Sequence, residues 1–277
     1  YSSVLFVADT AQSIYPQSWL VKGRSFSSVG FDIKGRSTAL AKNYRTTTQI
    51  AEAAYSLLEK DSNITEDENF VKPFLIDKQG SYPIFRIFDN KEKEANYVIS
   101  LIGELSKSYN YGDIAIIARK NEQIREFGQF LENAKVPYKI MTAQDGYEFG
   151  DDKVKILTMH SIKGLEFKVV IIVGLNSKAI PLTSSSVDDQ EYFESRERKL
   201  LYVGMTRATE KLYMTCDGTP SKFIADINPK LLKYSENALI RNFYSIKIDQ
   251  YVFAEKIKDP YGAEEKVRQW VINELKE

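Results

Sequence analysis

The chain has 277 residues, 43% of them hydrophobic and 27% charged, which is ordinary for a globular protein with a sizeable core. Lys plus Arg and Asp plus Glu both number 38, so the net charge is zero and any nucleic-acid site must be local rather than a strongly basic surface. The single cysteine, Cys216, excludes an internal disulfide, and no apolar stretch approaches the roughly 20 residues of a membrane span, so we expect a cytoplasmic protein without a membrane partner.

The first 82 residues alternate short ordered segments with irregular ones. Residues 4–8 form an apolar run typical of a strand, and since the chain starts directly inside this run, we expect an upstream half to be missing. Residues 20–42 and 60–82 are polar and loop-like. Between them, Thr46 and Thr47 are expected to cap a helix whose apolar face is formed by Ile50, Ala54, Leu57 and Leu58.

From residue 84 onwards, predicted strands and helices alternate. The strands are expected at residues 84–88, 114–118, 136–141, 154–159, 168–173 and 211–216. The helices are expected at residues 91–106, from a cap at Asn121 to about residue 134, and at residues 190–208. This alternation predicts an α/β fold with a mostly parallel sheet and helices on both faces.

Four polar segments lie at predicted strand or helix ends: residues 9–15, 43–46, 158–167 and 197–208. Because ligands bind where the carboxyl ends of parallel strands meet, we expect all four segments to gather at that edge.

Taken singly, each candidate has an ordinary structural interpretation. Gln12 and Tyr15 suit a turn, and Arg45 suits a surface salt bridge, although a cation is disfavoured near a helix start. His160 is the only histidine, so a histidine-cluster metal site is excluded, no metal ligand is predicted, and a lone core or surface histidine is the default. Arg207, expected on a helix and solvated unless it has a partner, suits an anion because its planar guanidinium matches phosphate.

Together, the four segments resemble motifs three to six of the UvrD/Rep family of superfamily 1 DNA helicases. The first is similar to the pattern GDxxQSIY, with Ala8 in place of the usual glycine, and Asn43-Tyr44-Arg45 resembles the fourth motif. The third segment matches TxHxxKGLEF at every specified position, and the last resembles RxLxYVxxTRA. Residues 111–139 also resemble a strand and helix of this family, so the resemblance runs from residue 4 to about residue 215.

The resemblance implies a nucleotide site with ATP and Mg²⁺ as cofactors. It implies that three residues contact the γ-phosphate: Gln12, Arg45 and Arg207. Tyr44 would stack on adenine, Glu166 would accept a hydrogen bond from the ribose, and Gly164 belongs to the same nucleotide-binding set.

The resemblance also implies single-stranded DNA as a partner. Tyr15 would stack on a base, and Trp19 would add a second stacking surface, although its local sequence departs from the family pattern. Thr158 and His160 would lie near the DNA backbone.

The implied architecture is the second of two RecA-like lobes. Residues 1–20 would be the last strand and the motif-three loop of an otherwise missing first lobe, and residues 21–216 the second lobe. Residues 217–277 would form a tail or a small appended subdomain. The stretch between Arg45 and Thr158 holds only alternating strands and helices, so the large subdomain that many relatives insert there is not expected.

Two features of a complete ATP site are missing from the sequence. There is no Gly-Lys dipeptide for a phosphate-binding loop, and no apolar strand ends in Asp-Glu to hold Mg²⁺. The resemblance therefore implies that the chain is part of an ATP-dependent 3′-to-5′ DNA helicase, and DNA repair is one process in which such helicases act. The partner of this chain would be the upstream lobe of the same protein, which would carry most of the Mg²⁺ ligands. This chain alone is expected to be inactive. The alternative is a non-catalytic helicase-like binding or scaffold module, and a nuclease-fused relative ranks lower.

Overall fold

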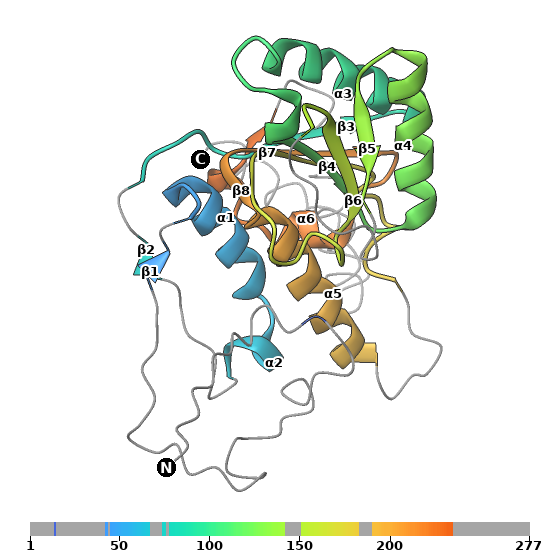
Figure 1. Ribbon diagram of the computed structural model, residues 1–277. Helices are drawn as coiled ribbons and strands as arrows, with labels where there is room; N and C mark the ends of the chain where they lie inside the picture. Colours follow the sequence, from blue (N-terminus) through green and yellow to red (C-terminus); the bar gives the residue numbers. More distant parts are fainter. Residues whose placement is uncertain are drawn as a thin grey trace, which may run out of the picture. The chain divides into compact units, whose positions relative to one another are not determined.

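The structure is a computed structural model, and it describes residues 14, 42–43, 45–66, 74–75, 78–141, 151–182 and 190–234 (Figure 1). Contacts within the chain divide it into two units, Tyr1–Lys233 and Tyr234–Glu277. The predicted strand at residues 4–8 and most of the predicted tail lie outside the described residues.

A seven-stranded sheet with the order β5-β6-β4-β7-β8-β3-β9 forms the centre of the first unit. Its strands are β3 (Ile84–Phe88), β4 (Ile114–Ala118), β5 (Tyr138–Ile140), β6 (Val154–Thr158), β7 (Phe167–Ile172), β8 (Ala208–Asp217) and β9 (Lys233–Tyr234). The pairings among β3 to β8 are parallel. The predicted parallel sheet is therefore confirmed.

Helices and short elements surround this sheet. They are α1 (Thr48–Leu58), α2 (Ser62–Thr65), α3 (Lys91–Leu105), α4 (Asn121–Asn133), α5 (Gln190–Met205) and α6 (Lys222–Asp226), the 3-10 helices η3 (Tyr111–Asp113) and η4 (Pro229–Leu231), and the parallel pair β1 (Lys42–Asn43) and β2 (Phe74–Leu75). None of the helices in the described part of the chain is long and apolar enough to cross a membrane.

The two faces of the sheet are covered by different helices. Ile116 of β4 belongs to the core that also contains residues of α3 and α4. The next residue, Ile117, faces α5 on the other side, because a Cβ atom added to Gly204 would lie 2.9 Å from its Cδ1 atom. Every residue of β4 is therefore buried, which explains its uninterrupted apolar sequence. In Figure 1, α3 and α4 lie apart from α1 and α5.

The end of α5 differs from its prediction. The helix ends at Met205 rather than at residue 208, and β8 begins at Ala208, three residues earlier than expected. The amide of Phe167 donates to the carbonyl of Arg207 at 3.1 Å, so the chain begins to pair with β7 immediately after the helix. Arg207 therefore lies in the connection between the two elements.

The predicted helix caps also differ. Thr47 occupies the N-cap position of α1 but makes no side-chain cap bond. Instead, the amide of Thr48 donates to the carbonyl of Lys78 at 2.8 Å. For α4 the N-cap residue is Lys120, not Asn121, and its amide donates to Gln123 at 3.0 Å. In α1 a distant loop therefore accepts from the first helical amide, and the expected bond to the threonine side chain is not made.

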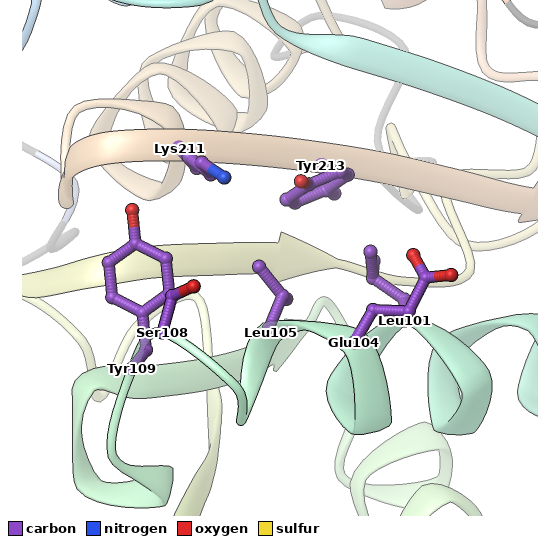
Figure 2. A pocket seen from close by; sticks show the side chains of 7 residues that line it. All are labelled: Leu101, Glu104, Leu105, Ser108, Tyr109, Lys211 and Tyr213. Atoms are coloured by element: carbon purple, nitrogen blue, oxygen red, sulfur yellow. The ribbon is translucent and has the colours of Figure 1, made fainter.

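A pocket of about 230 Å³ lies between α3 and β8 (Figure 2). Leu105 and Tyr109 line it from the end of α3 and the following turn, and Lys211 and Tyr213 line it from β8. Among the predicted nucleotide- and DNA-binding residues that the structure describes, none lines this pocket.

Candidate functional site

Three residues predicted for the nucleotide site come together in the structure. Arg45 forms an ion pair from its Nε atom to Oε1 of Glu166. Glu166 immediately precedes β7, and the amide of the next residue, Phe167, donates to the carbonyl of Arg207 at 3.1 Å. Arg45, Glu166 and Arg207 therefore gather around the amino ends of β7 and β8.

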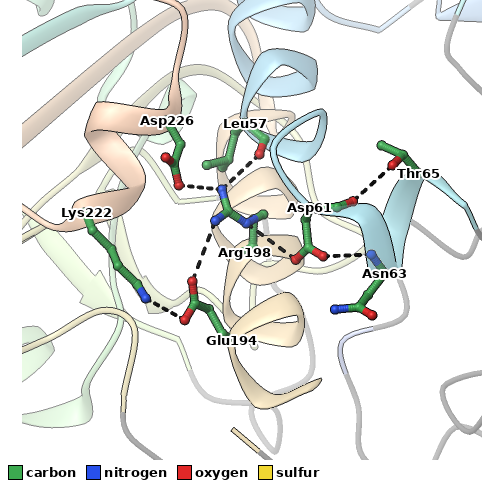
Figure 3. Close-up of polar contacts among 8 residues, drawn as sticks. All are labelled: Leu57, Asp61, Asn63, Thr65, Glu194, Arg198, Lys222 and Asp226. Atoms are coloured by element: carbon green, nitrogen blue, oxygen red, sulfur yellow. Dashed lines mark hydrogen bonds and ion pairs between the residues drawn. The ribbon is translucent and has the colours of Figure 1, made fainter. Parts of the chain in front are cut away.

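The arrangement of α1 and α5 explains how distant arginines reach this place. Arg45 lies just before α1 and Arg207 just after α5. Lys78 donates to the carbonyls of Arg45 and Thr209 at 2.8 and 3.1 Å. Arg198, in the middle of α5, donates to the carbonyl of Leu57 near the end of α1 at 3.1 Å (Figure 3). The two helices therefore pack with the beginning of one beside the end of the other.

The expected gathering of all motifs at one sheet edge is wrong. Arg45, Glu166 and Arg207 lie at the amino ends of β7 and β8, whereas Thr158 ends β6 and His160 follows its carboxyl end. The reason is that residues 158–167 connect two parallel strands, so the segment must cross from one edge of the sheet to the other.

The ion pair of Arg45 and Glu166 is exposed to solvent. The two side chains retain 37% and 44% of their accessible surface. An exposed pair of this kind contributes only about 0.2–1 kcal/mol to stability. The guanidinium can therefore exchange the carboxylate for a phosphate group at low cost.

Arg207, by contrast, is only 1% exposed. Its Nε atom donates to the carbonyl of Val203 at 3.1 Å, and Nη2 donates to Oγ1 of Thr206 at 3.3 Å. The expected place on a helix is wrong, because α5 ends at Met205 and Arg207 lies in the turn before β8, and its burial fits the expectation that it is solvated only without a partner. Its guanidinium is held out of water between the end of α5 and the start of β8.

Gly164 lies on the segment that joins the two edges of the sheet. Its φ angle is +89°, a conformation that side-chain-bearing residues rarely adopt. A Cβ atom added at this position would have no neighbouring atom within 4 Å, so the backbone conformation, not lack of space, is what favours glycine. Gly164 thus shapes the turn that delivers Glu166 to β7.

The carboxyl end of β6 carries the residues predicted to lie near DNA. The hydroxyls of Thr158 and Ser161 are 3.0 Å apart, and the amide of Ser161 donates to Thr158 Oγ1 at 3.2 Å, which closes a tight turn around His160. Burial lowers the pKa of His160, the positive charges of Arg119 and Arg196 lower it further, and a nearby carboxylate opposes them. The imidazole is therefore uncharged at neutral pH.

Sequence reasoning missed a buried ion pair beside this turn. Arg119, directly after β4, donates from Nε and Nη2 to Glu197 of α5 at 2.8 and 2.7 Å. The side chains are 12% and 1% exposed. Because Ala118 is paired with Thr158 in the sheet, Arg119 lies next to the start of the His160 turn. Arg119 could have been singled out from the sequence, because it directly follows a predicted strand that is wholly apolar.

The structure describes only some of the predicted site residues. Gln12, Tyr15, Trp19 and Tyr44 lie outside the described residues. Within the part of the chain that the structure describes, no three His, Cys, Asp or Glu residues are grouped so that they could hold a metal ion.

Comparisons with known proteins point to one family. The family model for the UvrD-like helicase C-terminal domain matches residues 38–149 and 144–218. The ATP-dependent DNA helicase PcrA of Leuconostoc citreum is 39% identical over 114 residues, which cover 37% of this chain and 15% of that protein. DNA helicase II of Rickettsia typhi is 27% identical over 233 residues, which cover 76% of this chain and 34% of that protein. The chain thus matches about a third or less of each relative's length.

A solved structure shares the fold. The crystal structure of the C-terminal domain of a possible DNA helicase from Lactobacillus plantarum WCFS1 aligns with a TM-score of 0.53 and 21% sequence identity. The alignment covers 70% of this chain and 99% of that one. At this identity the likeness establishes the fold only.

Proposed function

Because this chain belongs to the UvrD-like helicase C-terminal domain family, we propose that it is the C-terminal lobe of an ATP-dependent DNA helicase or translocase. In this proposal the chain supplies Arg45 and Arg207 to ATP bound between two lobes, and it contacts single-stranded DNA through the turn around His160. The direction of movement implied by the family is 3′ to 5′.

One observation carries the proposal. Two arginines far apart in sequence meet at the amino ends of β7 and β8: Arg45 pairs with the carboxylate of Glu166, and the carbonyl of Arg207 accepts from the amide of the residue after Glu166. The planar guanidinium group of each arginine matches the geometry of phosphate oxygens, so two arginines at the same edge of the sheet suit a polyphosphate.

The two arginines differ in a way that suits phosphoryl transfer. Arg45 is in contact with solvent and can bind an entering phosphate. Arg207 is buried, so water screens its interaction with a negatively charged phosphate very little. Arginines that stabilise the transferred phosphoryl group raise rates by about 10³–10⁵ in related chemistry. Gln12 would join them at the γ-phosphate, Tyr44 would stack on adenine, and Glu166, released from Arg45, would bind the ribose.

The proposed DNA contact uses hydrogen bonds and stacking more than charge. His160 is uncharged at neutral pH, so it would hydrogen-bond to the DNA backbone rather than pair with it as a cation. Thr158 would lie beside it, and Tyr15 and Trp19 would stack on bases. Residues 158–167 connect this place to Glu166, which gives a direct covalent path between the DNA contact and the ATP contact.

The proposed cofactors are ATP and Mg²⁺. When bound, Mg²⁺ would neutralise charge on the β- and γ-phosphates. We assign no Mg²⁺ ligand to the described residues, since no suitable group of side chains occurs among them. The phosphate-binding loop and the metal ligands would belong to the upstream lobe.

The decisive experiment measures DNA-stimulated ATP hydrolysis in a protein that joins this chain to an upstream lobe with a phosphate-binding loop. We expect Arg45→Ala and Arg207→Ala each to lower kcat by about 10³-fold or more, because each substitution removes a guanidinium group that would stabilise negative charge on the transferred phosphoryl group. Arg125→Ala, an exposed arginine of α4, is the matched control and should leave kcat unchanged. The chain by itself should hydrolyse no ATP.

Two results would overturn the proposal. Hydrolysis by the isolated chain would show that it holds a complete ATP site. Undiminished hydrolysis in both arginine variants of the joined protein, with binding to single-stranded DNA intact, would favour the scaffold alternative.

A further inference from the structure

The loop residue Lys78 joins the two segments that carry the arginines. Its ammonium group donates to the carbonyl of Arg45 at 2.8 Å and to the carbonyl of Thr209 at 3.1 Å. Arg45 lies just before α1, and Thr209 is the second residue of β8, two positions after Arg207. One side chain therefore bridges the start of α1 and the start of β8.

Lys78 is itself fixed by the helix that it helps to place. Its carbonyl accepts from the amide of Thr48 at 2.8 Å, which satisfies one of the amides at the start of α1. Two residues later, the amide of Gly80 donates to Oε1 of Gln49 at 2.8 Å. The loop therefore holds α1 through its main chain while the lysine side chain reaches across to β8.

This bridge differs in kind from the ion pair of Arg45 and Glu166. That pair joins two exposed side chains, and a bound phosphate would compete for the guanidinium. Lys78 instead holds main-chain carbonyls and is itself half-buried, so its contacts involve neither guanidinium group. The lysine can keep the two segments at a constant separation whether or not Arg45 is paired with the carboxylate.

We infer that Lys78 is a positioning residue that sets the separation of Arg45 and Arg207. The inference rests on the proposed function, because it assigns Lys78 a role toward a phosphate that the two arginines bind. Lys78 needs no contact with the nucleotide. Its effect arises through geometry, and a displacement of about 1 Å in a catalytic group can lower a rate by about 10²-fold.

The test uses the helicase implied by the proposed function, with this chain as its C-terminal lobe, and measures kcat and KM for ATP. Lys78→Met keeps the length of the side chain but removes its donors, and it should lower kcat by about 10- to 100-fold. Lys78→Arg can still donate to both carbonyls and should restore most of the rate. Lys93→Met is the matched control, since this exposed lysine of α3 pairs with Asp89 away from the site.

A second measurement separates positioning from loss of folding. In an Arg45→Ala background, Lys78→Met should have a much smaller effect on kcat than in the unmodified protein, because Lys78 acts partly through Arg45. A general loss of folded protein would multiply with the arginine effect instead. Thermal unfolding of each variant fixes an assay temperature at which all of them are folded.

The outcomes distinguish the two claims. If Arg45→Ala and Arg207→Ala lower kcat but Lys78→Met does not, the positioning role of Lys78 is wrong and the proposed function stands. The positioning role is equally wrong if Lys78→Met acts independently of Arg45→Ala. If neither arginine variant affects kcat, the proposed function fails and the role of Lys78 fails with it.

Discussion

Glu94 is a carboxylate that α3 buries against the sheet, with only 1% of its surface exposed. It accepts hydrogen bonds from the amide of Gly174 at 2.9 Å and from Oγ1 of Thr215 at 2.5 Å. Burial raises the pKa of Glu94 from 4.5 to about 7, and the two hydrogen bonds oppose this rise without cancelling it. The residue thus connects α3 to the loop after β7 and to β8.

We expect the buried carboxyl to make stability depend on pH. The folded-state pKa of Glu94 is above the unfolded value, so between pH 4.5 and 7 the folded state binds more protons than the unfolded state. Stability should therefore fall as the pH rises through this window, by an amount on the order of 3 kcal/mol from this residue. In Glu94→Gln that fall should be absent, because glutamine does not titrate.

Urea unfolding from pH 4.5 to 8 measures this effect, with Glu104→Gln on the exposed face of the same helix as control. The control should keep the pH dependence of the unmodified chain. Equal pH dependence in Glu94→Gln and the unmodified chain would show that burial does not shift this pKa.

At the start of α1, a loop packs so closely against the helix that one position of the loop must be glycine. The helix receives its cap from the loop at Lys78, and a Cβ atom added to Gly80 in that loop would lie 2.4 Å from Cγ2 of Thr47. Thr47 is a short, branched side chain with 3% exposure, so it cannot move aside easily. Gly80 is therefore needed for the close approach of loop and helix.

Gly80→Ala should lower the free energy of unfolding by about 1–3 kcal/mol, the usual cost of overpacking. Gly103→Ala is a control with the opposite expected sign, because that helical glycine has no atom within 4 Å of the added Cβ. Its substitution should raise stability by about 0.5–1 kcal/mol. Chemical denaturation measures both changes, and a neutral or stabilising Gly80→Ala would mean that the loop does not pack against α1 as described.

At the scale of the whole first unit, Arg198 joins several helices. Besides the carbonyl of Leu57 in α1, its guanidinium contacts Asp226 of α6 at 2.7 Å and Asp61, the N-cap of α2, at 3.5 Å. It also lies 4.6 Å from the ring centre of Phe223 (Figure 3 shows the polar contacts). The side chain is 6% exposed, so one buried cation connects α1, α2 and α6 to α5.

Arg198→Met should lower the free energy of unfolding by about 3–5 kcal/mol, because it leaves carboxylates such as Asp61 without their buried cation. Arg125→Met, at an exposed site, should change it by less than about 0.5 kcal/mol. Denaturant titration of the two variants tests this. A loss below about 1 kcal/mol in Arg198→Met would indicate that other contacts hold these helices together.

Local sequence patterns predicted much of the fold. The strands at residues 84–88 and 114–118 have the expected bounds. The motifs also indicated the family correctly. These features are readable because an apolar run or a motif is contiguous in the chain, and its meaning depends little on distant residues.

The distribution of the candidate residues in space, by contrast, follows from tertiary packing. The fold separates Thr158 from Glu166 across the sheet, buries Arg207, and lets Lys78 bridge α1 and β8. Each of these facts depends on which strands are neighbours and on where a side chain meets a carbonyl far away in the sequence. The order of residues thus specifies which chemical groups are present and where they lie along the chain. Long-range packing specifies which of these groups meet, because strand order and burial arise only when the whole sheet assembles.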